Sequence, residues 1–362
     1  MKLRFTKYLD PQRGLTLIEL LIAMAIGLFV VGAVSVLYIN TRSGFNYLEE
    51  VSRIQETGRF AIDTISRDIR MAGYNGCGKD VTTIANVVNG ASSSPFLDFS
   101  TPIRGYGDGV AFPTALSSAG AISGTDAIVL LGVDTSSEMV VQNHNPSSAQ
   151  IDTNTHSVKP GEILLITDCA KASIFQMTGP TNNNNNATNV VHNTGTGTPG
   201  NCTKFLGASC PSALTYTYKP GSSLIKIYSN AYFIANSSLN NGTRSLWSLA
   251  LEGSTSGSAV AKELLVGVNN MQIYYGLDMD GDGSADRYVT ADVVQSSGIW
   301  SKVNTVRISL LVTSTNTKVA TGKQSYLFQT TSGSTTESTV TPGDRILRRV
   351  FSETVVARNR VM

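Results

Sequence analysis

The first 73 residues show two hydrophobic patterns in succession, and the first of them is continuous. Residues 15–40 are almost all apolar, contain one carboxylate, Glu19, and carry no further charge before Arg42. About 20 consecutive apolar residues are enough to cross the hydrocarbon core of a bilayer. An ionisable group inside such a segment is costly and marks a functional position. The pattern therefore predicts a membrane-spanning helix with a special role for Glu19.

From residue 41 the pattern becomes amphipathic and predicts that the same helix continues to residue 73. Opposite charges four residues apart, such as Glu49 and Arg53, support a helix, and Gly73 is expected to end it. A continuous helix from Leu15 to Ala72 would be about 87 Å long. We expect its apolar stripe to lie on a sheet; a coiled-coil stalk is the alternative, although the heptad repeat is not sustained. The stripe comprises Phe45, Leu48, Val51, Ile54, Gly58, Ala61, Ile62, Ile65 and Ile69.

The leader, residues 1–14, has a net charge of +3 and is expected to stay in the cytoplasm. A secretory signal peptide would be cut after the apolar region, but here the apolar pattern runs on. The segment Gly14-Leu15-Thr16-Leu17-Ile18-Glu19 resembles the type IV prepilin class, with its N-terminal methylation motif. This resemblance implies cleavage after Gly14 by a prepilin peptidase and methylation of the new N-terminus, Leu15. An anchor that is never processed is the alternative, and it does not explain Glu19.

The resemblance also implies a partner for Glu19. In this class the carboxylate pairs with the terminal amine of a neighbouring subunit, here the amine of Leu15, and so sets the register of assembly. An unpaired charge in lipid or in a filament core would cost several kcal/mol. Most members begin with Phe; Leu15 keeps the bulk and apolarity that the position needs.

Residues 74–362 read as short β segments between polar turns, which predicts an α+β fold. By resemblance it is pilin-like: a long N-terminal helix packed on a large antiparallel β-rich head. Residues 344–356 are expected to form a last strand near the sheet edge. The tracts 181–200 and 314–342 are expected to be irregular, with a strand at 324–329. Other expected strands are 127–133, 162–167, 223–228, 232–235, 245–251, 267–276 and 303–312.

Two further segments narrow the resemblance from the prepilin class to one family within it. The helix exit Met71-Ala72-Gly73-Tyr74-Asn75-Gly76-Cys77 and the turn at Asp168-Cys169 resemble the PilW-type minor pilins. The C-terminal residues 344–356 also resemble the ending of this family. They imply a minor pilin that initiates or caps the tip of a type IV pilus, with other minor pilins, the major pilin and a tip adhesin as partners. They also imply a single-pass inner-membrane protein with a periplasmic head that later reaches the pilus at the cell surface. The alternatives are a GspJ-like pseudopilin of type II secretion and a membrane-anchored periplasmic enzyme.

The cysteines fit an oxidising compartment. Four cysteines allow three pairings, and all lie beyond the anchor. Cys202 and Cys210 could close a short local loop; Cys77 with Cys169 would then tie the helix exit to the head. Free buried thiols are the alternative. A zinc site is not favoured, because the chain has no Cys-x-x-Cys pair and its three histidines, His144, His156 and His192, lie in polar, loop-like sequence.

One acidic segment carries the pattern of a cation site. Carboxylates at alternate positions followed by a turn glycine can surround a hard cation such as calcium, as in an EF-hand-like loop. The twelfth position is Val289 where a Glu is expected, and Asp292 lies three residues later. A solvated hairpin turn is the alternative. The candidate ligands are Asp278, Asp280, Asp282, Asp286 and the Ser284 carbonyl, and calcium there would rigidify the head or an interface.

Composition excludes other classes of function. The chain has 28 Lys and Arg residues and 26 Asp and Glu residues. Without the four basic residues and one acidic residue of the leader, these totals become 24 and 25, a net charge of −1. No basic field exists for nucleic acid. The chain also lacks a nucleophile elbow, phosphate loop, zinc-helix motif or dinucleotide fingerprint, so the sequence does not predict an enzyme.

Overall fold

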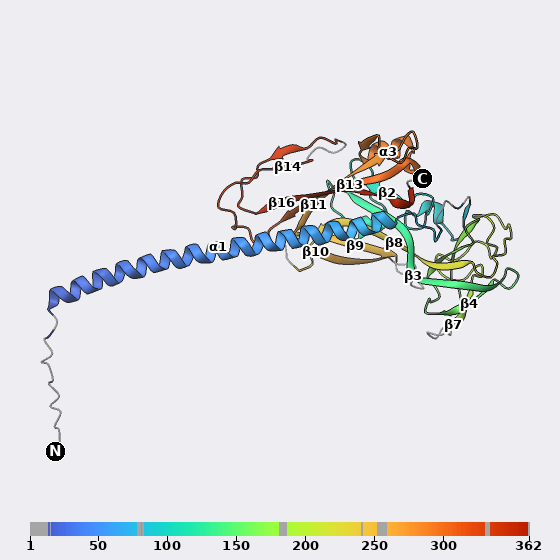
Figure 1. Cartoon of the computed structure of the whole chain (residues 1–362), viewed down its shortest axis with the longest axis horizontal. Coiled ribbons are helices and arrows are strands. Elements are labelled where there is room, and N and C mark those ends of the chain that lie inside the picture. The colour runs from blue at the N-terminus through green and yellow to red at the C-terminus, as the bar shows by residue number, and fades with distance from the viewer. Residues whose placement is uncertain are drawn as a thin grey trace, which may run out of the picture.

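A computed structural model describes residues 14, 16–77, 81, 83–180, 187–239, 242–251, 259–329 and 334–360. The leader up to Arg13 and the expected new terminus, Leu15, lie outside the described residues. One long helix projects from a β-rich head, and the described chain begins at the far end of that helix (Figure 1). The expected α+β, pilin-like fold is confirmed.

Helix α1 spans Leu17–Met71, 55 residues, which corresponds to a length of about 80 Å. Thr16 caps its first turn, and Ala72 is the C-cap residue. The next residue, Gly73, has φ +76°, a left-handed conformation that favours glycine and ends the helix as the sequence predicted.

A ten-stranded sheet forms the larger part of the head. Its main path runs β1-β6-β5-β8-β3-β4-β7; β2 also pairs with β3, and β9 joins β8 to β10. Among the described strands, β1 and β6 are parallel and the other pairs are antiparallel. The strands are β1 (Ile84–Asn86), β2 (Ile103–Tyr106), β3 (Ala127–Asn145), β4 (Gln150–His156), β5 (Ile163–Thr167), β6 (Ala172–Gln176), β7 (Ala187–Val191), β8 (Ser223–Asn236), β9 (Arg244–Leu251) and β10 (Ala259–Val266).

A four-stranded antiparallel sheet, in the order β12-β11-β13-β16, and a β14–β15 hairpin complete the head. These strands are β11 (Val268–Leu277), β12 (Arg287–Val289), β13 (Val303–Thr313), β14 (Tyr326–Phe328), β15 (Ser338–Val340) and β16 (Arg348–Val356). The short helices are α2 (Thr114–Ser118), α3 (Ala291–Ser297), η1 (Ala91–Ser93), η2 (Trp300–Lys302) and η3 (Arg358–Arg360). The last strand, β16, lies at a sheet edge as expected.

Several strand boundaries differ from the sequence prediction. The two strands expected at 223–228 and 232–235 are one strand, β8, because the side chain of Asn230 donates a hydrogen bond to Asp68 Oδ2 of α1 and so is satisfied inside the sheet. Strand β3 continues twelve residues past the expected end at 133. Strand β10 was not predicted, and β7 forms within the tract 181–200 that was expected to be irregular.

The second half of α1 lies against both sheets and supplies the centre of the largest core. Ile65 and Ile69 are fully buried there. They share one cluster with Ile128 of β3 in the large sheet and Ile308 of β13 in the small one. Burying each such side chain contributes about 1.5–3 kcal/mol. The helix is therefore part of the head's core and not an appendage to it.

The helix leaves the head earlier than its apolar stripe predicts. Phe45 is 69% exposed and Leu48 is 64% exposed, whereas Glu50 and Ile54 are the first buried positions. The expectation that Phe45 and Leu48 lie on the sheet is wrong. The periodic pattern continues beyond the point where the sheet ends, so it cannot locate that point.

Two carboxylates fix the helix to the head. Glu50 is 2% exposed, and its Oε1 accepts a hydrogen bond from Asn316 Nδ2 at 2.5 Å. Asp68 Oδ2 accepts hydrogen bonds from the Tyr232 hydroxyl at 2.7 Å and from Asn230 Nδ2 at 2.9 Å. Burial, followed by the charge of Asp68, raises the pKa of Tyr232, so its hydroxyl stays a donor. Hydrogen bonds to charged groups are among the stronger ones, so these contacts set the rotation of the helix.

Helix α1 approaches the small sheet closely at Gly58. A Cβ at this position would overlap with the ring of Phe351 on β16. Gly44, on the free part of the same helix, has no atom within 4 Å of where a Cβ would lie. Both glycines cost helix propensity, but only Gly58 is required by packing.

Gly58→Ala is expected to lower the free energy of unfolding by about 1–2 kcal/mol, because Phe351 must move and overpacking outweighs the gain in helix propensity. The measurement is denaturant unfolding of the full chain in detergent. Gly44→Ala, the matched control, should leave unfolding of the head unchanged. A Gly58→Ala variant as stable as Gly44→Ala would contradict the packing argument.

Candidate functional site

The first turn of α1 contains a capping box made by Thr16 and Glu19. The Glu19 amide donates to Thr16 Oγ1 at 3.4 Å, and Glu19 Oε2 accepts from the Thr16 amide and hydroxyl, both at 2.9 Å. Both residues are exposed in the single chain. The carboxylate that was singled out from the sequence therefore also caps its own helix. Sequence reasoning missed Thr16, although Thr-x-x-Glu before an apolar run is the signature of a capping box.

No part of the described chain buries the apolar half of α1. Large apolar side chains from Leu17 to Ile39 are 51% to 80% exposed. Helix α1 is long and apolar enough to span a membrane. An apolar surface of this extent requires lipid or other protein around it.

Both expected cysteine pairs form disulfides. Cys77, six residues after the end of α1, is bonded to Cys169, with Cα atoms 5.6 Å apart. Cys169 lies in the turn between β5 and β6, whose backbone amides donate to Asp168 Oδ1. Cys202 is bonded to Cys210. The alternative of free thiols is wrong, because none of the four cysteines is free.

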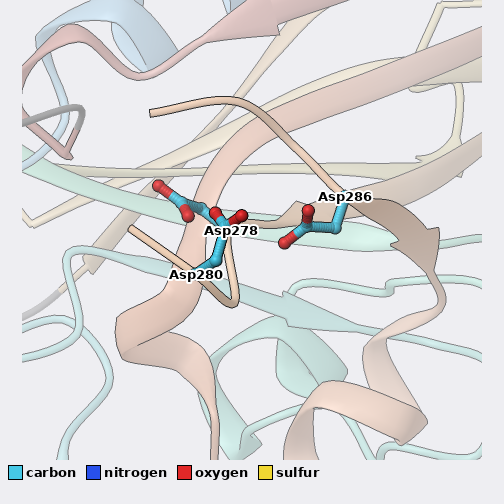
Figure 2. Close-up of side chains that lie close together, drawn as sticks. All are labelled: Asp278, Asp280 and Asp286. Carbon is cyan, nitrogen blue, oxygen red and sulfur yellow. The ribbon is translucent and has the colours of Figure 1, made fainter. Parts of the chain in front are cut away.

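The acidic segment forms the loop of the β11–β12 hairpin and gathers three carboxylates (Figure 2). One carboxylate oxygen from each of Asp278, Asp280 and Asp286 lies within 4.8 Å of the others. Asp278 is 9% exposed and holds the loop, because its Oδ1 accepts from the Gly281 amide at 2.6 Å and its Oδ2 from the Gly283 amide at 2.9 Å. Like charges this close repel unless a cation or protons offset them.

Asp282, the fourth candidate carboxylate, does not join this group. Asp282 Oδ1 accepts from the Ser284 amide at 2.7 Å, and Asp282 is not among the three clustered carboxylates. Val289 pairs with Tyr275 in the hairpin. Asp292 lies in the first turn of α3 and accepts a hydrogen bond from the Thr290 hydroxyl. The hairpin predicted as the alternative is therefore present, and it presents three of the four candidate carboxylates as a cluster.

The three histidines are buried, which corrects the predicted polar, loop-like surroundings: His144 lies in β3, His156 ends β4, and His192 directly follows β7. His144, His156 and His192 are 5%, 6% and 0% exposed. The polar residues beside them in sequence mislead because β3 and β4 alternate between faces. Burial lowers the pKa of His144 to about 4, and burial together with His144 lowers that of His192 to about 3, so both rings are neutral at neutral pH.

The fold and the site together define a class of protein. A long helix whose apolar first half is free, capped at its start by Glu19 and fixed by its second half to a β-rich head, is the arrangement of a pilin-like membrane-anchored protein. The prokaryotic N-terminal methylation motif matches residues 9–35.

Part of the head is similar to one particular family. The model of the type IV pilus-assembly protein W family, PilW, matches residues 231–359. No curated protein and no solved structure matches the chain. The chain is thus similar to minor pilins of type IV pili, and its N-terminal motif with the apolar helix indicates anchoring in the inner membrane, with the head outside, and then a place in the pilus.

The matched segment includes one part of the chain that suggested the family, the ending at residues 344–356, but not the two turns. Residues 231–359 contain β9 to β16 and thus the whole small sheet on which α1 packs. The turns at Cys77 and Cys169, on which the narrower resemblance depended, lie outside it. The same family is therefore indicated by two separate parts of the chain.

The two disulfides are expected to contribute unequally to stability. Bonded residues are 92 apart for Cys77–Cys169 and 8 apart for Cys202–Cys210. Chain entropy predicts a loss of about 4–5 kcal/mol when Cys77 and Cys169 are both changed to Ser, and about 2–3 kcal/mol for the other pair. Denaturant unfolding of the two full-length variants measures this. Equal losses would show that loop length does not control the effect here.

Proposed function

We propose that this protein initiates or caps the tip of a type IV pilus by packing α1 among the helices of other pilins. The observation that carries the proposal is the unburied apolar half of α1 with Glu19 in its first turn. In the membrane this surface meets lipid, and in a filament it meets the same surface of other pilins. Its partners are other minor pilins, the major pilin and a tip adhesin.

A large head supports a position at the tip. The chain from residue 74 onward forms two sheets and a hairpin on one helix, which is bulky to repeat along a thin fibre. Phe45, Leu48 and Phe60 lie on α1, remain exposed by 69%, 64% and 56%, and extend the apolar contact surface beyond the membrane-spanning part. A neighbouring helix that contacts these residues would bury them without disturbing the core.

The proposed cleavage site, after Gly14, and the proposed pairing residue, Glu19, lie close together in the sequence. A prepilin peptidase would cut after Gly14, which is exposed and has open space around it. The new amine on Leu15 of a neighbouring subunit would then meet Glu19. In the single chain Glu19 satisfies the amide of Thr16, so assembly adds a charged partner to a carboxylate that is already held in place.

The PilW match favours pilus assembly over the pseudopilin alternative. We propose a structural role and not catalysis, because neither the motifs nor the acidic loop supplies a nucleophile with its base.

Charge pairing at Glu19 predicts a specific pattern of variants. Glu19→Ala and Glu19→Gln should each reduce the number of pili at least about tenfold, since both remove the charge that would pair with the amine. Pili are counted by electron microscopy in a strain that carries only the variant gene. Cross-linking to co-expressed pilins measures incorporation directly.

Thr16→Val separates the two roles of Glu19. It removes the hydroxyl of the capping box and keeps the carboxylate, so piliation should remain close to normal. If Glu19→Gln assembles as well as the wild type, the carboxylate is needed only as a cap and the pairing proposal fails.

We further propose that the Asp278, Asp280 and Asp286 cluster binds calcium and rigidifies the β11–β12 loop. Oxygen ligands at alternate loop positions suit this ion, and the loop backbone is already held by Asp278. Solvent would supply the remaining ligands, because three carboxylates fall short of the six to eight oxygens that calcium takes.

Calcium at about 1 mM should raise the melting temperature of the full-length protein, as a ligand that binds the folded state does. Asp280→Asn should abolish the rise, because it removes a clustered ligand. Asp282→Asn is the matched control in the same loop and should retain it. If the wild-type protein shows no rise, the loop is only a turn.

A further inference from the structure

A cavity of about 640 Å³ lies in the head, and none of its lining residues belongs to α1 or to the acidic loop. It is open on one side and is bounded by the small sheet, the β14–β15 hairpin and two loops, residues 107–112 and 123–126. Its volume is in the range of sites for small molecules. The assembly role described above does not use it.

The floor of the cavity is the polar face of β11. Asn270 and Gln272 line it, while Met271 and Ile273 between and beside them are fully buried in the core that contains α1. Gln272 is 5% exposed, and its Nε2 donates to Asn270 Oδ1 at 3.1 Å, which orients both amides. Alternation along the strand thus places a pair of fixed amide groups in the cavity.

Two carboxyl groups form one wall. Asp126 is 3% exposed, and its Oδ2 accepts from the Ile273 amide at 2.7 Å. Its other oxygen lies against Gly107, where any side chain would overlap with it. Asp108 also lines the cavity and lies in the turn directly after Gly107. Burial, and secondly the charge of Asp108, raises the pKa of Asp126 well above its usual range, so this carboxyl can donate a hydrogen bond.

Aromatic rings line the remaining sides. Tyr326 and Phe328 of β14 and Phe112 of the first loop contribute to the cavity. Leu327, between the two aromatic residues, is 57% exposed and does not line the cavity. Flat apolar rings beside fixed amide and carboxyl groups suit a ligand that has both C–H faces and hydroxyl groups.

We propose that this cavity binds a neutral saccharide through the amides of Asn270 and Gln272, the carboxyl groups of Asp108 and Asp126, and stacking on Tyr326. The cavity lining contains no Lys, Arg or His among the described residues, so an anionic ligand would meet carboxyl groups without a counter-charge. A cationic ligand is the competing occupant, and the experiment distinguishes it.

Binding is tested by calorimetry on the full-length protein in a detergent without sugar headgroups. The probes are maltotriose and chitotriose as neutral trisaccharides, 3′-sialyllactose as an anionic one and trilysine as a cationic peptide. At least one neutral trisaccharide should bind, and 3′-sialyllactose and trilysine should not. No binding of either neutral probe up to about 10 mM would overturn the proposal, as would binding of trilysine alone.

Two neighbouring variants locate the site. Tyr326→Ala should weaken saccharide binding about tenfold, whereas Leu327→Ala on the same strand should leave it unchanged. Equal effects would show that the saccharide binds elsewhere. Ala111→Trp adds a bulky ring at an exposed position on the cavity lining and should block binding even if Tyr326→Ala does not fold. Normal binding to Ala111→Trp would also overturn the proposal.

Discussion

The contact on which the rest of the structure depends is the packing of one helix on two sheets. The buried stripe of α1 shares a core with β3 and β8 of the large sheet and with β11 and β13 of the small one. Separated from the helix, each sheet would expose an apolar face. The same helix carries the apolar half that leaves the head. Because one face of its second half is buried and is fixed by Glu50 and Asp68, the orientation of the free half is set by the head's own folding.

The sequence predicts the helix well because its two halves carry different, long patterns. A continuous apolar run and a 3.6-residue stripe can each be recognised over many turns. The stripe could not show that Phe45 and Leu48 stay exposed, since that depends on where the sheets end. Strand boundaries were harder to predict for the same reason, since they depend on contacts with distant parts of the chain. Asn230 looks like a break in sequence but is satisfied by Asp68, a partner 162 residues away.

The candidate sites also differ in how far the sequence predicts them. Glu19, the acidic loop and the two cysteine pairs were recognised because each is defined by short spacing or by a small number of residues. The clustering of Asp278, Asp280 and Asp286 without Asp282 depends on how the loop folds around the Gly281 and Gly283 amides, which spacing does not specify. The cavity could not be predicted at all, because its lining comes from separate segments between residues 107 and 340 that form no motif.

The small sheet connects the two proposed activities through its two faces. Along β11, Met271 and Ile273 point into the core that contains α1, and Asn270 and Gln272 face the cavity. On β13, Ile308 likewise lies in the core that contains α1, and Leu311 lines the cavity. A helix that packs on one face of this sheet leaves the other face uncovered by it. Assembly through α1 therefore does not compete for the cavity residues, and a pilin incorporated by its helix can still present the opposite face of the sheet to a ligand.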